Sequence, residues 1–414
     1  MSLRVGMVAG EPSGDLLAAR VIQGIGRHVA DSRCEGIGGP AMLEQRLDMW
    51  HSMNALTVFG YADAFKRLPS LLNTYFNVKR RWLKHPPDVF VGVDAPDFNL
   101  RLEQQLKQAG IPTVHFVGPS IWAWRYERID KIRAAVSHML VLFPFEEAIY
   151  QKEGVPVTYV GHPLAEIIPM QPDRGAVRKH LGIDQGARVL ALMPGSRASE
   201  IRLLAPRFLQ AAQRLLQQDP KLQILVPMVN RQRRHEFELF LRQYPVANLR
   251  LLEQEPAPGG ASRTVVLPDS DVAAASAYAA RPAAWNAMEA ADAVLVASGT
   301  ATLEAALFKR PMVISYVLSP TMRRLMEWKS GQSRPYVPWV GLPNVLLNDF
   351  AVPELLQDEA TPEALAEAAW KALTDRDYAQ RIAARFTVMH QSLWRDTPAL
   401  AAQAILEQAR HGAG

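Results

Sequence analysis

Short apolar segments alternate with longer amphipathic segments along most of this chain, and this alternation constrains the fold more than any other feature. The apolar segments cover residues 3–9, 88–94, 113–118, 138–143 and 157–161, and a second series covers 188–193, 223–228, 249–253, 293–297 and 311–317. Strands that alternate with helices pair in parallel through crossover connections. The sequence therefore predicts an α/β protein with two Rossmann-like halves.

A proline-rich segment over residues 163–174 separates the two series and predicts a linker. A chain of 414 residues is long for one hydrophobic core. We therefore expect an N-terminal domain over 1–170 and a second domain over 171–352. The pattern after Pro353 is helical, so 353–414 is expected to be a helical tail that packs back across the domains.

Bulk properties exclude several classes of protein. The chain has one cysteine, Cys34, and an ordinary globular composition with 49% hydrophobic residues. Its first residues lack a secretory pattern, and no apolar run is long enough to cross a bilayer, so a cytoplasmic protein is expected. The net charge of +5 favours anionic partners, but no nucleic-acid-binding motif accompanies it.

Polar motifs follow the predicted strands, and parallel strands bring such motifs to the same edge of a sheet, where ligands bind. These motifs are GEPSGD at 10–15, DAPDFN at 94–99, PSIWAW at 119–124, PGSR at 194–197, SGTATLE at 298–304 and GLPN at 341–344. No GxGxxG motif follows the first strand, which argues against a nicotinamide or flavin enzyme.

The motif at 298–304 combines a strand end with a helix start. Backbone N–H groups and hydroxyls at Ser298, Gly299 and Thr300 predict a phosphate site, because a helix N-terminus attracts anions. Glu304 lies one turn into the helix. Arg197 ends another strand-end motif and has the fixed charge that suits a diphosphate. From the residues alone, a capping cluster explains 298–304 equally well, and a structural salt bridge explains Arg197 better.

Two carboxylates at the end of another predicted strand compete for the role of a general base. Asp94 directly follows the strand, whereas Asp97 precedes a helical pattern and is expected to cap it. We therefore favour Asp94. His115 and His162 are the other possible bases; His115 is expected to be a core histidine, and His162 has the alternative of reaching phosphate.

A turn before a predicted helix from about Leu16 gives a second candidate site for phosphate or sugar at Ser13, Gly14 and Asp15. Asn344 is a further candidate for contact with a donor substrate, although a capping role explains it equally well.

Aromatic and aliphatic residues recur at near-helical spacing beside basic residues over 61–85. Phe65, Leu68, Leu72 and Trp82 are the candidates for membrane or acyl-chain contact. Trp122, in another loop, is a further candidate. The alternative explanation is an ordinary core stripe beside a solvated charged face.

One motif, Asp269-Ser270-Asp271, matches a metal-binding DxD pattern, but it lies in an irregular segment over 256–284 that is expected to be an inserted loop. The same pattern recurs by chance at 375–377. We therefore expect no metal site.

Together with Gly161-His162-Pro163, the strand-end motifs resemble those of the lipid-A-disaccharide synthase family, in the same order and over nearly the whole chain. The resemblance implies a GT-B fold, in which two Rossmann-like domains face a central cleft. It also implies an inverting glycosyl transfer from UDP-2,3-diacylglucosamine to 2,3-diacylglucosamine 1-phosphate, with UDP released and no cofactor.

The resemblance also assigns roles. It implies that Asp94 is the base and that Arg197 acts on the diphosphate. The remaining expected contacts are Ser298, Gly299, Thr300, Glu304 and Asn344 on the UDP-sugar side, and Ser13, Gly14, Asp15 and Asp97 on the acceptor side.

The acylated substrates favour peripheral binding to the anionic inner face of the cytoplasmic membrane. Two alternative functions remain. One is another UDP-sugar enzyme on the same fold, such as an undecaprenyl-linked N-acetylglucosaminyltransferase or a 2-epimerase, and the other is an inactive sugar-binding protein at the membrane surface.

Overall fold

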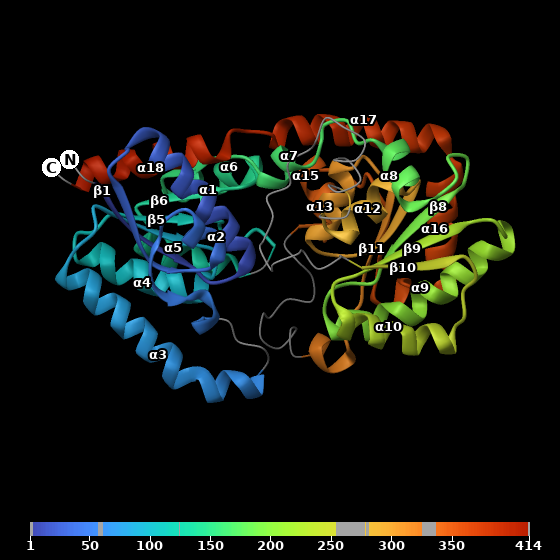
Figure 1. Ribbon diagram of the computed structural model, residues 1–414, viewed down its shortest axis with the longest axis horizontal. Coiled ribbons are helices and arrows are strands. Elements are labelled where there is room, and N and C mark those ends of the chain that lie inside the picture. The colour runs from blue at the N-terminus through green and yellow to red at the C-terminus, as the bar shows by residue number, and fades with distance from the viewer. Residues whose placement is uncertain are drawn as a thin grey trace. The chain divides into compact units, whose positions relative to one another are not determined.

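The computed structural model describes residues 3–56, 61–123, 125–253, 278, 281–324 and 337–412, with side chains except at 61–68 and 411–412 (Figure 1). The chain forms two compact units. The first comprises Met1–Glu166 and Ser392–Gly414, and the second comprises Ile167–Gln391. The chain thus enters the second unit just before the domain boundary expected after residue 170.

The first unit contains a seven-stranded parallel sheet in the order β3-β2-β1-β4-β5-β6-β7. Its strands are β1 (Leu3–Ala9), β2 (Ser32–Gly38), β3 (Asp48–Ser52), β4 (Val89–Val93), β5 (Thr113–Phe116), β6 (His138–Val141) and β7 (Val157–Tyr159). The strand order reverses between β1 and β4. Loops that follow these two strands therefore diverge and leave room for a ligand at the carboxyl edge of the sheet.

Helices supply the apolar residues that cover this sheet. They are α1 (Pro12–His28), α2 (Pro40–Glu44), α3 (Tyr61–Lys84), α4 (Pro96–Gln108), α5 (Ile129–Ala135), α6 (Pro144–Lys152), α7 (Pro163–Ile167) and α18 (Thr397–Gly412), with 3₁₀ turns at Met53–Ala55 and Tyr126–Arg128. Residues of α1 and α18 share one hydrophobic cluster with β1 and β4, and residues of α3 and α4 share another with β1 and β4. Figure 1 shows α18, at the C-terminus, beside α1.

The second unit contains a six-stranded parallel sheet in the order β10-β9-β8-β11-β12-β13. Its strands are β8 (Val189–Met193), β9 (Gln223–Met228), β10 (Leu249–Glu253), β11 (Ala293–Ala297), β12 (Met312–Tyr316) and β13 (Glu354–Leu356). Its helices are α8 (Arg174–Leu181), α9 (Ala198–Gln218), α10 (Arg231–Gln243), α12 (Ala283–Ala290), α13 (Thr300–Leu307), α15 (Leu342–Leu347), α16 (Pro362–Thr374) and most of α17 (Arg376–Leu393), with a 3₁₀ turn at Gln357–Glu359. Here the strand order reverses between β8 and β11.

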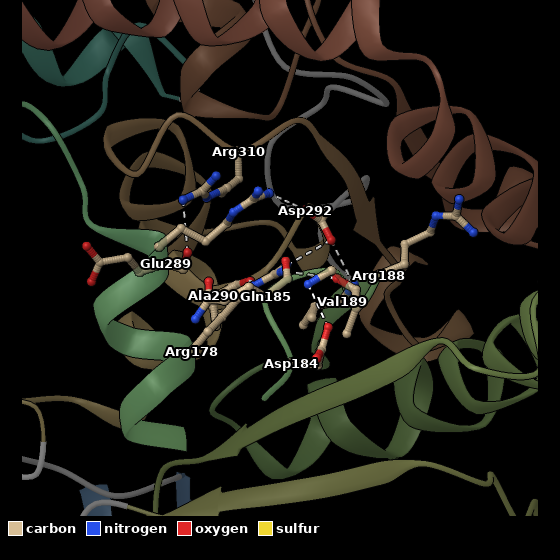
Figure 2. A network of polar contacts seen from close by, with 12 residues as sticks. Arg178, Asp184, Gln185, Arg188, Val189, Glu289, Ala290, Asp292 and Arg310 are labelled. Atoms are coloured by element: carbon tan, nitrogen blue, oxygen red, sulfur yellow. Dashed lines mark hydrogen bonds and ion pairs between the residues drawn. The ribbon is translucent and has the colours of Figure 1, made fainter. Parts of the chain in front are cut away.

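A buried polar network joins α8 to the amino ends of β8 and β11 (Figure 2). The Arg178 guanidinium donates to the carbonyl oxygen of Ala290 and to the Asp292 carboxylate, each at 2.9 Å. Asp292 also accepts the backbone N–H of Val189 at 2.8 Å. This network lies at the amino ends of the strands, opposite their carboxyl ends. Arg178 therefore stabilises the fold and does not face a ligand at the carboxyl ends.

The structure confirms the predicted alternation, adds β2 and β3, which the predicted strand series lacked, and corrects three local expectations. The segment after Pro353 is not wholly helical, because Glu354–Leu356 pairs with β12 as a short edge strand. The expected helical tail is divided between the two units. The expected linker begins with helix α7, since Pro163 occupies a position at which a helix needs no N–H donor. No helix in the described part of the chain is long and apolar enough to cross a membrane.

Candidate active site

A pocket of about 410 Å³ lies at the carboxyl ends of β8, β9 and β11, within the second unit. It brings together Arg197, Ser298, Gly299, Thr300 and Glu304, which come from the two strand-end motifs of this unit. The other lining residues are Met193, Pro194, Gly195, Ser196, Glu200, Pro227, Met228, Val229, Pro282, Ala283, Ala284, Ala297 and Ala301. The structure therefore confirms that these predicted residues share one site, at the point where the strand order reverses.

The turn from β11 into α13 forms one wall of this pocket. Gly299 caps the helix with φ 147° and ψ −164°, a conformation that is accessible only to glycine. The Ser298 hydroxyl donates to Val340 O at 3.4 Å, and the Thr302 hydroxyl donates to Gly299 O at 2.8 Å. The positive end of the helix dipole thus points into a pocket lined with hydroxyl groups, which is suitable for a phosphate.

Glu304 lies one turn further along α13 and lines the same pocket. Burial raises its pKa to about 7, although a hydrogen bond from the Trp285 side chain acts in the opposite direction. Its carboxyl group can therefore accept hydrogen bonds from vicinal hydroxyl groups when it is ionised. Sequence reasoning did not find Trp285, because no motif marks it and only the tertiary fold places α12 beside α13.

Arg197 precedes α9 and extends into solvent, with 81% of its side chain exposed. Its backbone N–H and that of Ser196 donate to the Glu200 carboxylate at 3.1 and 2.8 Å. The nearest guanidinium–carboxylate distance between Arg197 and Glu200 is 3.8 Å. The loop is therefore fixed by Glu200, while the arginine head remains exposed to a ligand.

Asn344 does not face the pocket, so the prediction that it binds the donor is wrong. Its side chain is fully buried, donates to Val352 O and Glu354 at 2.8 Å each, and accepts the N–H groups of Ala351 and Val352. All four hydrogen-bonding positions of the amide are used within the protein. Asn344 therefore anchors the segment that leads into β13.

Asp94 follows β4 in the first unit, at the other strand-order reversal. Asp94 and Ala95 both have left-handed backbones, with φ of 53° and 44°. Because residues other than glycine rarely adopt this conformation, the turn is a strained feature at a position where ligands bind.

Asp97 does not cap α4 as expected. The helix begins at Pro96 with Ala95 in the capping position and no side-chain cap. Asp97 instead has 89% of its side chain exposed and forms an ion pair with Arg128 at 3.1 Å. Proline at the first helical position moved the start of the helix ahead of Asp97.

The predicted helix start near Leu16 is also wrong, because α1 begins at Pro12. Ser13 is exposed and Gly14 is buried in the first turn of this helix. The buried Asp15 carboxylate accepts N–H groups of Gly39, Ala41 and Met42 at 2.8, 2.9 and 3.1 Å. These bonds cap α2, so Asp15 is a structural anchor and not an open sugar contact.

Burial argues against both histidines as bases. His115 is fully buried, and its Nδ1 lies 2.8 Å from Glu103, as expected of a core histidine. His162 accepts the Leu164 N–H through Nδ1 at 3.2 Å, and burial lowers its pKa to about 4. His162 is therefore neutral, and the alternative that it reaches phosphate is not supported.

The structure divides the predicted membrane residues between core and surface. Trp82 is fully buried and packs against Trp50 and Phe90, so its predicted membrane contact is wrong. Leu72 is 40% exposed. Phe65 and Leu68 lie outside the residues whose side chains are described.

Two exposed apolar residues of α3, Phe76 and Leu83, were missed, although helical periodicity from Leu72 indicates them. Phe76 is 58% exposed and shares a surface depression with Leu83 and three basic residues. These basic residues are Lys79, Arg80 and Lys84.

Trp122, in the loop after β5, is half-buried. Its indole N–H donates to Glu146 at 3.2 Å, and its ring packs edge-on against Phe145. Packing therefore accounts for part of this side chain, and its acyl-chain contact stays a prediction.

No cluster of three or more potential metal ligands occurs among the described residues. Asp269 and Asp271 lie outside them, so the rejected DxD motif stays untested.

Comparison with known families identifies a match along most of the chain. A family model described as lipid-A-disaccharide synthetase matches residues 5–258 and 265–405. A lipid-A-disaccharide synthase from Bordetella pertussis (strain Tohama I) is 70% identical over 409 residues, which cover 99% of each chain. A lipid-A-disaccharide synthase from Aromatoleum aromaticum is 47% identical over 408 residues, covering 98% of this chain and 96% of the relative.

Solved structures share the fold at low sequence identity. A UDP-GlcNAc 2-epimerase from Neisseria meningitidis, bound to UDP-GlcNAc, aligns with a TM-score of 0.57 and 12% identity over 99% of this chain and 100% of its own. WaaG, a glycosyltransferase involved in lipopolysaccharide biosynthesis, aligns with a TM-score of 0.54 and 15% identity over 97% of this chain and 99% of its own. The two parallel-sheet, Rossmann-like units therefore form a GT-B fold, as the family resemblance implied.

Proposed function

This chain belongs to the lipid-A-disaccharide synthase family, UDP-sugar glycosyltransferases of lipid A biosynthesis, and on that premise we propose its substrates and the residues that act on them. The donor is UDP-2,3-diacylglucosamine, and the acceptor is 2,3-diacylglucosamine 1-phosphate. The products are the acylated disaccharide 1-phosphate and UDP.

The observation that carries the proposal is the pocket of the second unit. It combines a helix N-terminus, an exposed arginine and a buried carboxyl group within one cavity. We assign the diphosphate to Ser298, Gly299, Thr300 and Arg197, and the ribose hydroxyls to Glu304. Negative charge that develops on the departing UDP is stabilised by Arg197 and the helix dipole, a role that requires no metal ion.

Asp94 acts as the base in this proposal. As the acceptor hydroxyl attacks the anomeric carbon, Asp94 takes the hydroxyl proton, the new glycosidic bond forms, and the bond to the UDP oxygen breaks. Attack from the face opposite UDP inverts the anomeric centre. The exposed Asp97, paired with Arg128, and the exposed Ser13 stay candidates for acceptor contact.

Helix α3 supports the proposal of a membrane-facing surface, which we assign to the inner face of the cytoplasmic membrane. Leu72, Phe76 and Leu83 are exposed near Lys79, Arg80 and Lys84. Exposed apolar side chains beside basic ones suit an anionic leaflet that also carries the acylated substrates.

Product formation from defined substrates tests the assignment of the reaction. Purified chain is incubated in detergent and EDTA with the acylated donor and acceptor, and disaccharide and UDP are quantified. Equal amounts of both products are expected. Absence of product with and without added magnesium would contradict the substrate assignment. Strict dependence on added metal would contradict the metal-free mechanism. Conversion of UDP-GlcNAc to its 2-epimer would favour the epimerase alternative.

Vesicle co-sedimentation tests the α3 surface separately. The double variant Leu72→Ser, Phe76→Ser should bind phosphatidylglycerol vesicles about tenfold more weakly. Each substitution removes an apolar side chain that the membrane would bury. Leu239→Ser removes another half-exposed leucine, on α10, and serves as the matched control. Unchanged binding of the double variant would contradict the assignment of this surface.

A further inference from the structure

We propose that Asn99 is a positioning residue for the transfer reaction: its side-chain amide holds the left-handed turn that presents the Asp94 carboxylate. This inference rests on the proposed role of Asp94 as the base.

The turn after β4 requires support because two consecutive residues other than glycine are left-handed there. Asp94 has φ 53°, and Ala95 has φ 44° and ψ 53°. The turn also packs closely against the end of β1, since a Cβ atom at Gly10 would lie only 2.8 Å from the Ala95 Cβ. A small relaxation of this turn would therefore move the Asp94 carboxylate.

Asn99 makes the contacts that prevent such relaxation. It is fully buried in the first turns of α4, and its Nδ2 lies 2.7 Å from Asp94 O, 3.3 Å from Val93 O and 3.4 Å from Val8 O. Its backbone N–H donates to Ala95 O at 3.0 Å. One residue thus ties the strained turn to the ends of both β4 and β1, the two strands at the strand-order reversal.

Other buried polar side chains follow Asn99 in this part of the core and indicate that it is not optimised for stability alone. Glu103, one turn further along α4, is fully buried and faces His115 at 2.8 Å. Glu103 Oε2, His115 Nε2 and Asn99 Oδ1 have no hydrogen-bond partner within the described residues. Burial raises the pKa of Glu103.

Buried polar atoms without partners destabilise a fold, and apolar side chains of the same shape would avoid that cost. Support of the Asp94 turn gives the Asn99 amide a function that an apolar residue cannot provide.

A double-mutant cycle separates positioning from general stability. Asn99→Leu keeps the side-chain shape but removes the donor, and Asn99→Ser is the second variant if the leucine variant does not fold. Each is made in the native chain and with Asp94→Ala, and kcat, the KM values, UDP affinity and thermal unfolding are measured. Thr113→Val is the matched control, because Thr113 is also fully buried in the first unit and donates to Ala135 O at 2.8 Å, away from Asp94.

Asn99→Leu should lower kcat on the order of 100-fold in the native chain, because a misplaced catalytic group costs about that much. The donor KM and UDP affinity should not change. With Asp94→Ala present, the same substitution should cost no more than about twofold. Thr113→Val should lower the unfolding temperature without lowering kcat.

Two results would overturn the inference. An equal loss of kcat from the Asn99 substitution in both backgrounds would show that Asn99 acts independently of Asp94. If Asp94→Ala alone leaves kcat unchanged, the proposed base is wrong, and the role of Asn99 falls with it; the single variants distinguish these two failures.

Discussion

The two sheets end their central strands in turns of different kinds. In the second unit, β11 enters α13 through Gly299, at φ 147°; in the first, β4 enters α4 through Asp94 and Ala95, both left-handed. A Cβ atom at Gly299 would have no heavy atom within 4 Å, so its backbone conformation alone requires glycine.

The same topological position therefore holds a turn of a different kind in each unit. The glycine turn adopts its conformation without steric strain and leaves the helix N-terminus next to a pocket. The turn at Asp94 places a carboxylate there instead, at about 1–2 kcal/mol of strain for each left-handed residue. Each turn is bonded to a buried side chain: the Thr302 hydroxyl donates to Gly299 O at 2.8 Å, and the Asn99 amide donates to Asp94 O at 2.7 Å.

The largest effect is expected at the Asp94 turn of the first unit. Asp94→Ala should lower kcat by roughly 10²–10⁴-fold, the usual contribution of a general base, and UDP affinity should stay unchanged. Steady-state kinetics and calorimetric titration with UDP measure the two quantities. Asp130→Ala, which removes another exposed acid of the first unit, serves as the control. A greater loss of kcat from Asp97→Ala than from Asp94→Ala would exchange the assignments of the two carboxylates.

The next largest effect is expected at Arg197, in the second unit. Arg197→Ala should lower kcat about 10²–10³-fold, because a fixed cation that faces developing negative charge acts most strongly in the transition state. Arg242→Ala, at an exposed position in the last turn of α10, is the matched control. A change confined to KM would show that Arg197 binds donor and transition state equally.

The glycine turn itself gives a smaller effect, on stability. Gly299→Ala should destabilise the protein by about 1–3 kcal/mol, because the new side chain fits the space but not the backbone conformation. Gly26→Ala also enters open space, but within helix α1, and should stabilise by about 0.5–1 kcal/mol. Urea unfolding measures both. Equal effects of the two substitutions would show that the φ of Gly299 is not the cause.

The smallest effect concerns the pH dependence of UDP binding. Burial raises the pKa of Glu304 to about 7, so the carboxyl group is mostly protonated below pH 7 and ionised above it. Ribose hydroxyls donate better to the ionised form, so UDP affinity should rise about fivefold from pH 6 to pH 8. Titration of the Glu304→Gln variant subtracts the ionisation of UDP itself. An identical rise in that variant would remove Glu304 from the ribose site.

Sequence periodicity predicted much of the fold, because strand–helix alternation is a local property. The exceptions were β2, β3 and β13, which the predicted series lacked. Of these, β13 at Glu354–Leu356 is short, and its strand character depends on pairing with β12. Helix starts at Pro12 and Pro96 were placed too late, and the cap expected from Asp97 is absent.

Residues of two strand-end motifs in the second unit lie together, as the sequence predicted. Arg197 and residues 298–300 share one pocket because the carboxyl ends of parallel strands meet at one edge. Trp285 gave no such signal, since it reaches Glu304 from another helix.

The family, the two Rossmann-like halves and the strand-end motifs could be predicted from the sequence, because each depends on the local order of residues. Which polar or aromatic residues are internal became known only from the fold. Asn344 and Asp15 form their hydrogen bonds within the protein, and Trp82 packs against residues of the first sheet. Burial and hydrogen bonding depend on residues that are distant in the chain, so a local motif does not predict them.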